Sequence, residues 1–161
     1  MDQRIDHSRY KVIPRSLIFI FSGSNLLLIS KYDKTASAGK ANVLGGHIEA
    51  GESILFSAYR ELNEESGIID VDLEYAGNIM VDGVGGLGVS LHLFKGEANS
   101  LTISPSGEGS LSWVSVDDLP KIPVFEDLMI LVPMVKDWKL GDSLIIGHYP
   151  ISEKSNPSFS F

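Results

Sequence analysis

Three glutamates on one predicted helix are the residues of this chain best suited to chemistry. Glu61, Glu64 and Glu65 lie within Ser53–Ser66, a segment whose apolar residues recur at helical spacing. On a helical wheel the three side chains fall within about 100° of arc, and their stripe overlaps the edge of the apolar face. Glu65 is nearly in line with the apolar residues, so we expect it to point toward the protein body.

Clustered carboxylates at the edge of a core are unfavourable unless a cation neutralises them. Like charges three and four residues apart repel each other, and an unpaired buried carboxylate is strongly destabilising or takes up a proton. A hard divalent cation such as Mg²⁺ removes both penalties, because it prefers carboxylate oxygens. We therefore expect the three glutamates to face a common metal site. The alternative is a solvated acidic helix face.

Residues around the glutamates fit the same picture. Arg60 is spaced for an i,i+4 pair with Glu64, and Glu52 is within reach of Arg60 from the preceding loop. An arginine fixed among glutamates orients them and moderates their repulsion. Gly46 lets the backbone approach a ligand closely. His47 beside it is placed either to contact phosphate or to lie on the surface.

The segment 46–68 resembles the Nudix box, G-x5-E-x7-R-E-U-x-E-E-x-G-U, in which U is aliphatic. Every specified position is filled, by Gly46, Glu52, Arg60, Glu61, Leu62, Glu64, Glu65, Gly67 and Ile68. The wider resemblance to MutT-like Nudix domains covers roughly residues 15–135. It implies an α/β/α sandwich around a mixed β-sheet. It also implies a hydrolase that uses Mg²⁺, with Mn²⁺ as a substitute, to cleave the pyrophosphate linkage of a nucleotide.

The resemblance implies roles for individual residues as well. Glu61, Glu64 and Glu65 are expected to ligate the metal, and the carbonyl of Gly45 to add a ligand. Either Glu61 or Glu64 is expected to act as the base on the attacking water, while the arginine and glutamate paired above orient them. A further glutamate in a later loop often completes the metal site in this family. Glu108 occupies the matching place, with a solvated loop acid as the alternative.

Positions outside the box bear on the substrate. ADP-ribose hydrolases of this family usually carry a proline beyond the box, near Val84 here, and dinucleoside polyphosphate hydrolases usually carry a tyrosine in the same zone. Neither residue type occurs in Asp82–Gly88. By elimination, the resemblance favours members that cleave a nucleoside triphosphate to monophosphate and pyrophosphate. ADP-ribose and dinucleoside polyphosphates are the alternative substrates.

Two details favour an oxidised purine triphosphate such as 8-oxo-dGTP. Asn42 matches an asparagine that contacts the base in enzymes that sanitise such nucleotides. Glu126 and Asp127 resemble an acidic pair that reads the purine edge in animal members, and Phe125 is placed to stack on the ring. The structural alternatives are a turn residue at position 42 and the N-terminal acids of a helix at 126 and 127.

Two functions of other classes stay open. One is a non-catalytic Nudix-like nucleotide-binding domain, although such domains usually lose glutamates of the box and this chain keeps them all. The other is an acidic interaction module whose helix merely binds Ca²⁺ or Mg²⁺. Its glutamates lack the alternating spacing of an EF-hand loop.

The elements that must position these residues alternate irregularly between strands and helices. This favours one α/β domain over residues 1–161 with a mixed sheet. Hydrophobic patterning predicts helices over 53–66 and 125–136. It predicts strands over 16–21, 26–30, 89–96 and 111–116, and either two strands over 71–76 and 78–81 or one bent strand there. It also predicts a C-terminal hairpin within 144–161, with its turn at 153–156.

Composition narrows the partners. The net charge is −8, from 21 acidic and 13 basic residues, which disfavours binding to nucleic acid polymers. No apolar segment is long enough to span a bilayer, so no membrane partner is expected. The sequence has no cysteine, which is compatible with a cytoplasmic location. The expected partner is a small-molecule nucleotide, bound by a monomer or a homodimer.

Overall fold

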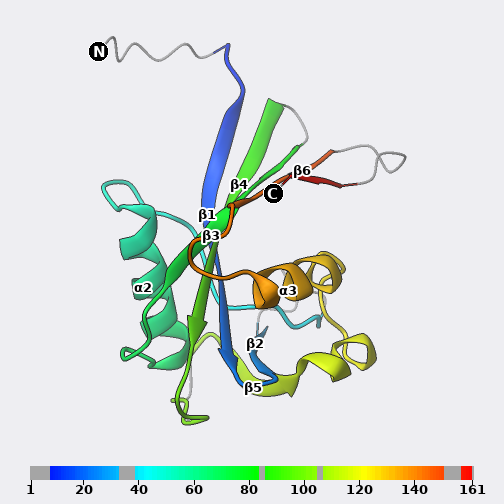
Figure 1. The fold of residues 1–161 in the computed structure, drawn as a ribbon. Coiled ribbons are helices and arrows are strands. Elements are labelled where there is room, and N and C mark those ends of the chain that lie inside the picture. The colour runs from blue at the N-terminus through cyan, green and yellow to red at the C-terminus, as the bar shows by residue number, and fades with distance from the viewer. Residues whose placement is uncertain (1–7, 33–38, 84–85, 105–106, 151–156, 161) are drawn as a thin grey trace.

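The computed structural model describes residues 8–32, 39–83, 86–104, 107–150 and 157–160. Its strands are β1 Lys11–Ser22, β2 Asn25–Lys31, β3 Glu74–Val81, β4 Leu87–Glu97, β5 Gly109–Ser115, β6 Ile145–Tyr149 and β7 Ser158–Ser160. Its helices are α2 Ile54–Ser66, the 3-10 helix η2 Val116–Lys121 and α3 Leu128–Asp137. In this part of the chain seven strands form one sheet in the order β5-β2-β1-β4-β3-β6-β7 (Figure 1).

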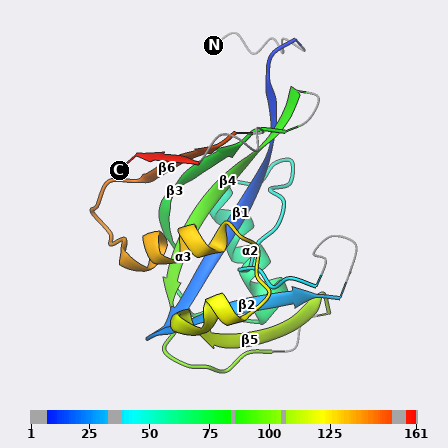
Figure 2. The same cartoon turned by 90° about the vertical axis from the view of Figure 1, so that its right-hand side faces the viewer.

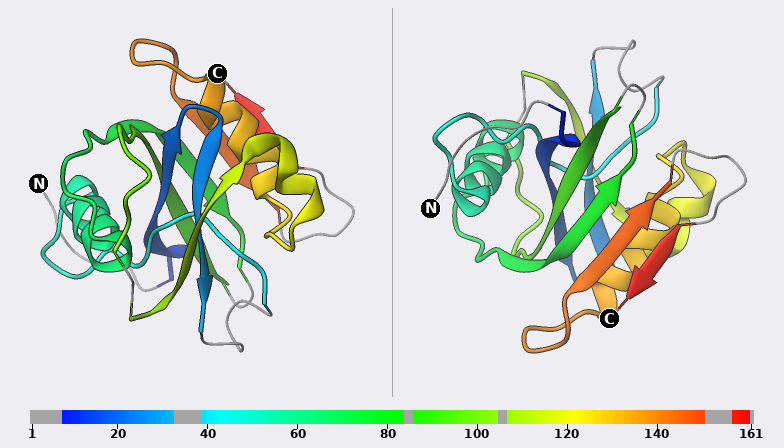
Figure 3. Two further views of the ribbon diagram at one scale, coloured as in Figure 1. Left: turned by 90° about the horizontal axis from the view of Figure 1, so that it is seen from below. Right: turned by 90° about the horizontal axis from the view of Figure 1, so that it is seen from above.

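The sheet is mixed, and the helices cover its two faces. Strand β1 pairs in parallel with β4 and antiparallel with β2. Helices α2 and α3 lie on opposite sides of the sheet, as Figures 2 and 3 show. The side chains of β1 alternate between the two layers, because Phe19 packs with α3 and Ile18 packs with α2. The predicted α/β/α sandwich is confirmed.

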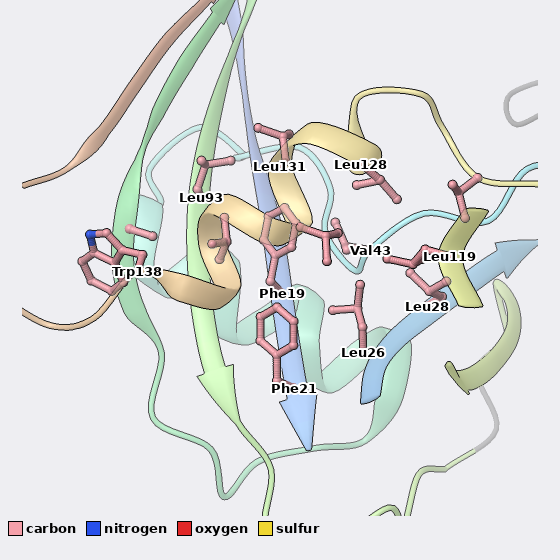
Figure 4. Packing of buried hydrophobic residues seen from close by; sticks show 14 of the residues in the cluster. Phe19, Phe21, Leu26, Leu28, Val43, Leu93, Leu119, Leu128, Leu131 and Trp138 are labelled. Atoms are coloured by element: carbon pink, nitrogen blue, oxygen red, sulfur yellow. The ribbon is translucent and has the colours of Figure 1, made fainter. Parts of the chain in front are cut away.

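The hydrophobic core on the α3 side holds that helix against the sheet. Figure 4 shows Phe19, Leu93, Leu131 and Trp138 in this cluster. Phe19, Leu93 and Leu131 are completely buried. Burial of side chains this large is worth about 1.5–3 kcal/mol each. The segment that leads into α3 is therefore anchored close to the sheet. None of the helices in the described residues is long and apolar enough to cross a membrane.

Helix α2 agrees with the sequence prediction at both ends. The Ser53 hydroxyl caps its first turn by accepting from Phe56 N at 3.2 Å. Gly67 follows the last residue with a φ of 71°, and its N–H donates to Asn63 O at 2.8 Å. Ala58 and Leu62 are fully buried against the sheet, so the rotation of the helix about its axis is fixed.

Helix α3 starts later than the prediction of 125–136. It runs from Leu128 to Asp137 because the segment before it pairs with another part of the chain. Ala41 N donates to Pro123 O at 2.7 Å, and Phe125 N donates to Ala41 O at 3.3 Å. These bonds hold the backbone extended up to Phe125, which therefore cannot belong to the helix.

The strand after α2 agrees with one of the two predicted alternatives. Residues 71–76 and 78–81 were expected to form two strands or one bent strand, and they form the single strand β3, with a register shift between Tyr75 and Gly77. This strand begins later than predicted, at Glu74. A Cβ at Gly77 would collide with the backbone carbonyl of Ile145, so a glycine is needed where β6 joins the sheet. The predicted C-terminal hairpin is present as β6 paired antiparallel with β7. Its turn, predicted at residues 153–156, lies outside the described residues.

Candidate active site

The loop before helix α2 lies against strand β1, and two glycines permit this. Ser16 N donates to Gly46 O at 2.9 Å. Gly45 has a φ of 135°, and a Cβ there would collide with the backbone carbonyl of Ser16. At Gly46 a Cβ would collide with the carboxylate of Glu61. The loop is therefore enclosed between the sheet on one side and the acidic face of α2 on the other.

Arg60 binds three of the predicted site glutamates at once. Its Nε is 2.6 Å from Glu52 Oε1, and its Nη1 is 2.8 Å from Glu61 Oε1. The same Nη1 is 2.9 Å from Glu64 Oε2. Its Nη2 donates to the carbonyl of His47 at 3.1 Å. Both ion pairs expected from the sequence spacing, with Glu52 and with Glu64, are present.

The contact between Arg60 and Glu52 is strong enough to change how both groups titrate. The hydrogen bond from Arg60, helped by a bond from Glu49 N at 2.9 Å, lowers the pKa of Glu52 to about 2. The hydrogen bond to Glu52 in turn raises the pKa of Arg60. The guanidinium and the Glu52 carboxylate therefore stay charged throughout the physiological range.

Glu65 points into the protein, as the helical wheel predicted, and its side chain is 0% exposed. Its Oε2 accepts a hydrogen bond from Gly45 N at 2.8 Å. Its Oε1 is buried and has no hydrogen-bond partner in the described part of the chain, although Lys31 Nζ lies 3.0 Å away as an ion pair. Burial raises the pKa of Glu65, while the bond from Gly45 and the charge of Lys31 oppose the rise.

Glu108 comes to the same place from a distant part of the sequence. Lys31 is opposite Gly109 in the β2–β5 register, so the residue before Gly109 lies beside the lysine. Lys31 Nζ donates to Glu108 Oε2 at 3.2 Å. One ammonium group therefore joins Glu65 and Glu108, which places the predicted loop glutamate next to the acidic helix.

The predicted acids thus form two groups, each held by a cation of the chain. Glu61 and Glu64 meet on the guanidinium of Arg60, and Glu65 meets Glu108 on Lys31. Within the described residues no three acidic, histidine or cysteine side chains are arranged to hold a metal as they stand. The three carboxylates expected to face a common point are therefore not gathered in this arrangement.

The residues nevertheless fit a hard divalent cation. The donors are all oxygens, which Mg²⁺ prefers. Glu65 Oε1 is a buried carboxylate oxygen without a hydrogen bond, so a ligated cation would satisfy it. Glu61 is nearly buried beside Gly46, whereas the side chain of Glu64 is 50% exposed and open to water.

A cavity of about 420 Å³ adjoins the acidic site on the α3 side of the sheet. This volume lies in the range typical of small-molecule sites. Asn42, Phe125 and Asp127 were all predicted to contact the nucleobase, and all three line the cavity. Its lining residues are Arg15, Ser16, Leu17, Ile29, Lys31, Lys40, Asn42, Val43, Gly45, Val81, Val89, Leu91, Phe125 and Asp127.

Three predicted substrate contacts are placed elsewhere. The side chain of Glu126 is 94% exposed and lies 3.6 Å from Lys40 Nζ, and Glu126 does not line the cavity that Asp127 lines. His47 is exposed, and its carbonyl accepts from Arg60 and Ser57. Gly46 is buried beneath Glu61 and does not line the cavity. The structure therefore brings one of the two predicted acids, Asp127, to the cavity.

Asp127 is an unusual acid for a cavity wall. Burial is the main cause that raises its pKa. Burial, together with the charge of the nearby Asp127, raises the pKa of the Tyr149 phenol to about 12. The hydroxyl of Tyr149 is buried and has no hydrogen-bond partner among the residues described. Tyr149 is opposite the cavity residue Val81 in the β3–β6 register.

Three cations of the cavity were missed by sequence reasoning. Arg15, Lys31 and Lys40 all line it, in a chain whose net charge is −8. Arg15 and Lys31 lie in strands β1 and β2, but each is just outside the strands predicted over 16–21 and 26–30. Only the pairing of these strands shows that they converge. Tyr149 was missed for the same reason, since only the β3–β6 register places it opposite the cavity residue Val81.

Comparison with known proteins supplies a family for this arrangement. A model of the NUDIX domain matches residues 12–131. An oxidized purine nucleoside triphosphate hydrolase of Danio rerio is 30% identical over 141 residues, which are 86% of this chain and 90% of that protein. The protein with the same name in Mus musculus is 27% identical over 140 residues, which are 86% of each chain.

A solved structure agrees with the fold. The MutT protein from Bacillus halodurans superposes with a TM-score of 0.70, at 24% sequence identity. The match covers 92% of this chain and 96% of the other. The order of the strands and the positions of the two helices are therefore those of a MutT-like domain.

Replacing Arg60 with alanine is expected to destabilise the fold. The substitution leaves the nearly buried carboxylate of Glu61 without its partner, so the free energy of unfolding should fall by about 2 kcal/mol. Urea denaturation without divalent metal measures this change. Lys121→Ala is the control, because it breaks an exposed ion pair of 2.6 Å with Asp118 and should change stability much less. Equal effects of the two substitutions would contradict the central position given to Arg60.

The ion pair of Glu52 should make stability depend on acid. The pKa of Glu52 in the folded chain, about 2, lies below its ordinary value of 4.5. Its contribution is therefore complete above the ordinary value and is lost as the pH falls toward 2. Wild type should be more stable than Glu52→Gln at neutral pH, and the two should approach each other in acid. Denaturation curves over this pH range test the expectation, and a pH-independent difference would refute it.

Proposed function

Because this chain belongs to the Nudix family of hydrolases, we propose that it acts on an oxidised purine nucleoside triphosphate, such as 8-oxo-dGTP. The products would be the monophosphate and pyrophosphate, and the cofactor would be Mg²⁺. One observation carries the proposal: two residues that line the base-sized cavity also contact the acidic face of helix α2. Gly45 and Lys31 both line the cavity, and both contact the buried carboxylate of Glu65.

This shared boundary sets the direction in which a nucleotide would lie. If the base lies in the cavity, the sugar and phosphates would extend past Gly45. Gly45 contacts Glu65, so the phosphates would then lie at the acidic face of α2. The cationic side chains of Arg15 and Lys31 at the cavity would attract the phosphates. The scissile anhydride would therefore reach the carboxylates without any rearrangement of the sheet.

The cavity wall offers suitable chemistry for a purine. Leu91, Val89 and Phe125 supply apolar and aromatic surface for the ring. Asp127 lines the same wall, and its carboxyl oxygens can accept from a purine N–H group. Oxidation of a purine changes the hydrogen-bond donors and acceptors on the edge of its ring. The names of the Danio rerio and Mus musculus relatives are consistent with such a substrate.

The chain's own residues would perform the hydrolysis as follows. The metal ligands would be the carboxylates of Glu61, Glu64, Glu65 and Glu108 and the carbonyl of Gly45. These residues would hold Mg²⁺, which would lower the pKa of a bound water and offset the negative charge of the phosphate oxygens and the leaving group. Glu64 is the better candidate for the base that accepts the proton of water, because it is more exposed than Glu61. Arg60 keeps both carboxylates oriented.

Removing single carboxylates should abolish activity but preserve the fold. Glu64→Gln and Glu65→Gln are expected to lower kcat by about 10²–10⁴-fold with Mg²⁺. Phosphate analysis under saturating substrate measures kcat, and circular dichroism checks the fold. Glu97→Gln serves as the control, since Glu97 is an exposed acid at the far end of β4. The assignment of the site is wrong if both site variants retain near-wild-type turnover.

A substrate screen tests the nucleotide class directly. The purified chain with Mg²⁺ is offered dNTPs, 8-oxo-dGTP, ADP-ribose and dinucleoside polyphosphates, and the products are separated. Preference for 8-oxo-dGTP, with monophosphate and pyrophosphate as products, supports the proposal. AMP and ribose 5-phosphate from ADP-ribose would replace it with the alternative substrate class. No turnover of any compound would indicate a nucleotide-binding domain without catalysis.

The two neighbouring acids should differ in their effect on substrate binding. Asp127→Ala removes a group that lines the cavity, so KM for the preferred purine triphosphate should rise by about tenfold or more, with a smaller change in kcat. Glu126→Ala is the matched control, and its KM should stay within about twofold because that side chain is exposed to solvent. Steady-state kinetics on both variants decides the matter. The proposed base site is wrong if Glu126→Ala raises KM more than Asp127→Ala.

A further inference from the structure

Lys31 is the residue that connects the acidic site to the cavity. It is the last residue of strand β2, opposite Gly109 of β5. Figure 1 shows these two strands side by side. Its Nζ is 3.0 Å from Glu65 Oε1 and 3.2 Å from Glu108 Oε2, and its side chain is 34% exposed where it lines the cavity. No pattern in the sequence assigns it a role, because the Nudix box does not include it.

The position of the ammonium group has an electrostatic cause. Glu65 is fully buried, and Gly45 N satisfies only its Oε2. The other oxygen needs a positive charge, since a buried carboxylate without a counter-charge is strongly disfavoured. Lys31 supplies that charge at the point where two carboxylates meet. The same two carboxylates are ligands of the metal in the function proposed above.

We propose that Lys31 is an internal counter-cation that competes with the divalent metal for Glu65 and Glu108. The proposal rests on the metal-dependent function above. When a divalent ion binds these carboxylates, the ammonium must leave them, because two cations cannot occupy one gap. The flexible stem of Lys31 then allows its charge to remain at the cavity, where the phosphates of a nucleotide would lie. Lys31 is thus a positioning residue that couples metal binding to nucleotide binding.

The other cation of the site cannot do this. The guanidinium of Arg60 is planar, and all three of its nitrogens donate to surrounding groups, including the carbonyl of His47. It is therefore fixed. The ammonium of Lys31 is a compact charge on a four-carbon chain and exchanges partners readily. Coupling follows from linkage, since a nucleotide that binds the released ammonium also favours the metal that released it.

The test measures Mn²⁺ binding to the whole chain by electron paramagnetic resonance of the free ion, without nucleotide. Lys31→Met should bind Mn²⁺ at least about tenfold more tightly than wild type, because the competing charge is gone. Lys40→Met is the matched control: Lys40 lines the same cavity, is 39% exposed, and pairs with the solvent-exposed Glu126. Its Mn²⁺ affinity should stay within about twofold of wild type.

A second measurement tests the coupling. A non-hydrolysable purine triphosphate analogue should tighten Mn²⁺ binding to wild type and do so much less in Lys31→Met. Lys31→Gln is measured in parallel, so that a folding defect of one variant does not decide the result. Equal or weaker Mn²⁺ binding by both Lys31 variants would overturn the proposal.

The outcomes separate this proposal from the function on which it rests. If Glu65→Gln loses Mn²⁺ binding but the Lys31 variants match wild type, the metal site stands and the role of Lys31 is wrong. If wild type and the Lys31 variants all fail to bind Mn²⁺, the metal-dependent function itself is wrong, and the competition proposed for Lys31 falls with it.

Discussion

The buried charge of Glu65 is the constraint on which the site depends. Its carboxylate lies inside the protein because helix α2 is locked in rotation by Ala58 and Leu62 against the sheet. A charge in that position must be met by donors and cations. Gly45 N and Lys31 Nζ meet it, and in doing so they tie the loop before α2 and the end of β2 to the helix. The active-site geometry is therefore a consequence of neutralising one side chain.

The acids of the site are divided between two cations with different mechanical properties. Arg60 binds Glu52, Glu61 and Glu64 through a rigid planar group, and so sets the spacing of the acids on the outer side of the helix. Lys31 binds its two acids through a flexible chain. The rigid guanidinium of Arg60 keeps its acids permanently ordered, whereas the flexible side chain of Lys31 can exchange its partners. The function proposed above, in which the site accepts a metal and later releases product, would use both properties.

Much of this site could be predicted from local sequence, and the rest depends on the sheet. The caps of α2 and the burial of Glu65 follow from helical periodicity over a few residues. The meeting of Lys31 with Glu108 does not, because 77 residues separate them and only the β2–β5 register joins them. Which member of the pair Glu126 and Asp127 faces the cavity was also beyond reach, because it depends on where α3 begins. That start is set by backbone bonds to distant Ala41.

The distribution of charge argues for a small nucleotide over a polymer. The chain as a whole is acidic, with a net charge of −8, yet Arg15, Lys31 and Lys40 gather around one cavity of about 420 Å³. The base and sugar of one nucleotide would fit such a volume, and its phosphates would then meet these cations. A polynucleotide would bring further phosphates beyond the cavity, and the net negative charge of the chain would repel them. The size of the cavity and the charge around it therefore both favour a single nucleotide over a polynucleotide.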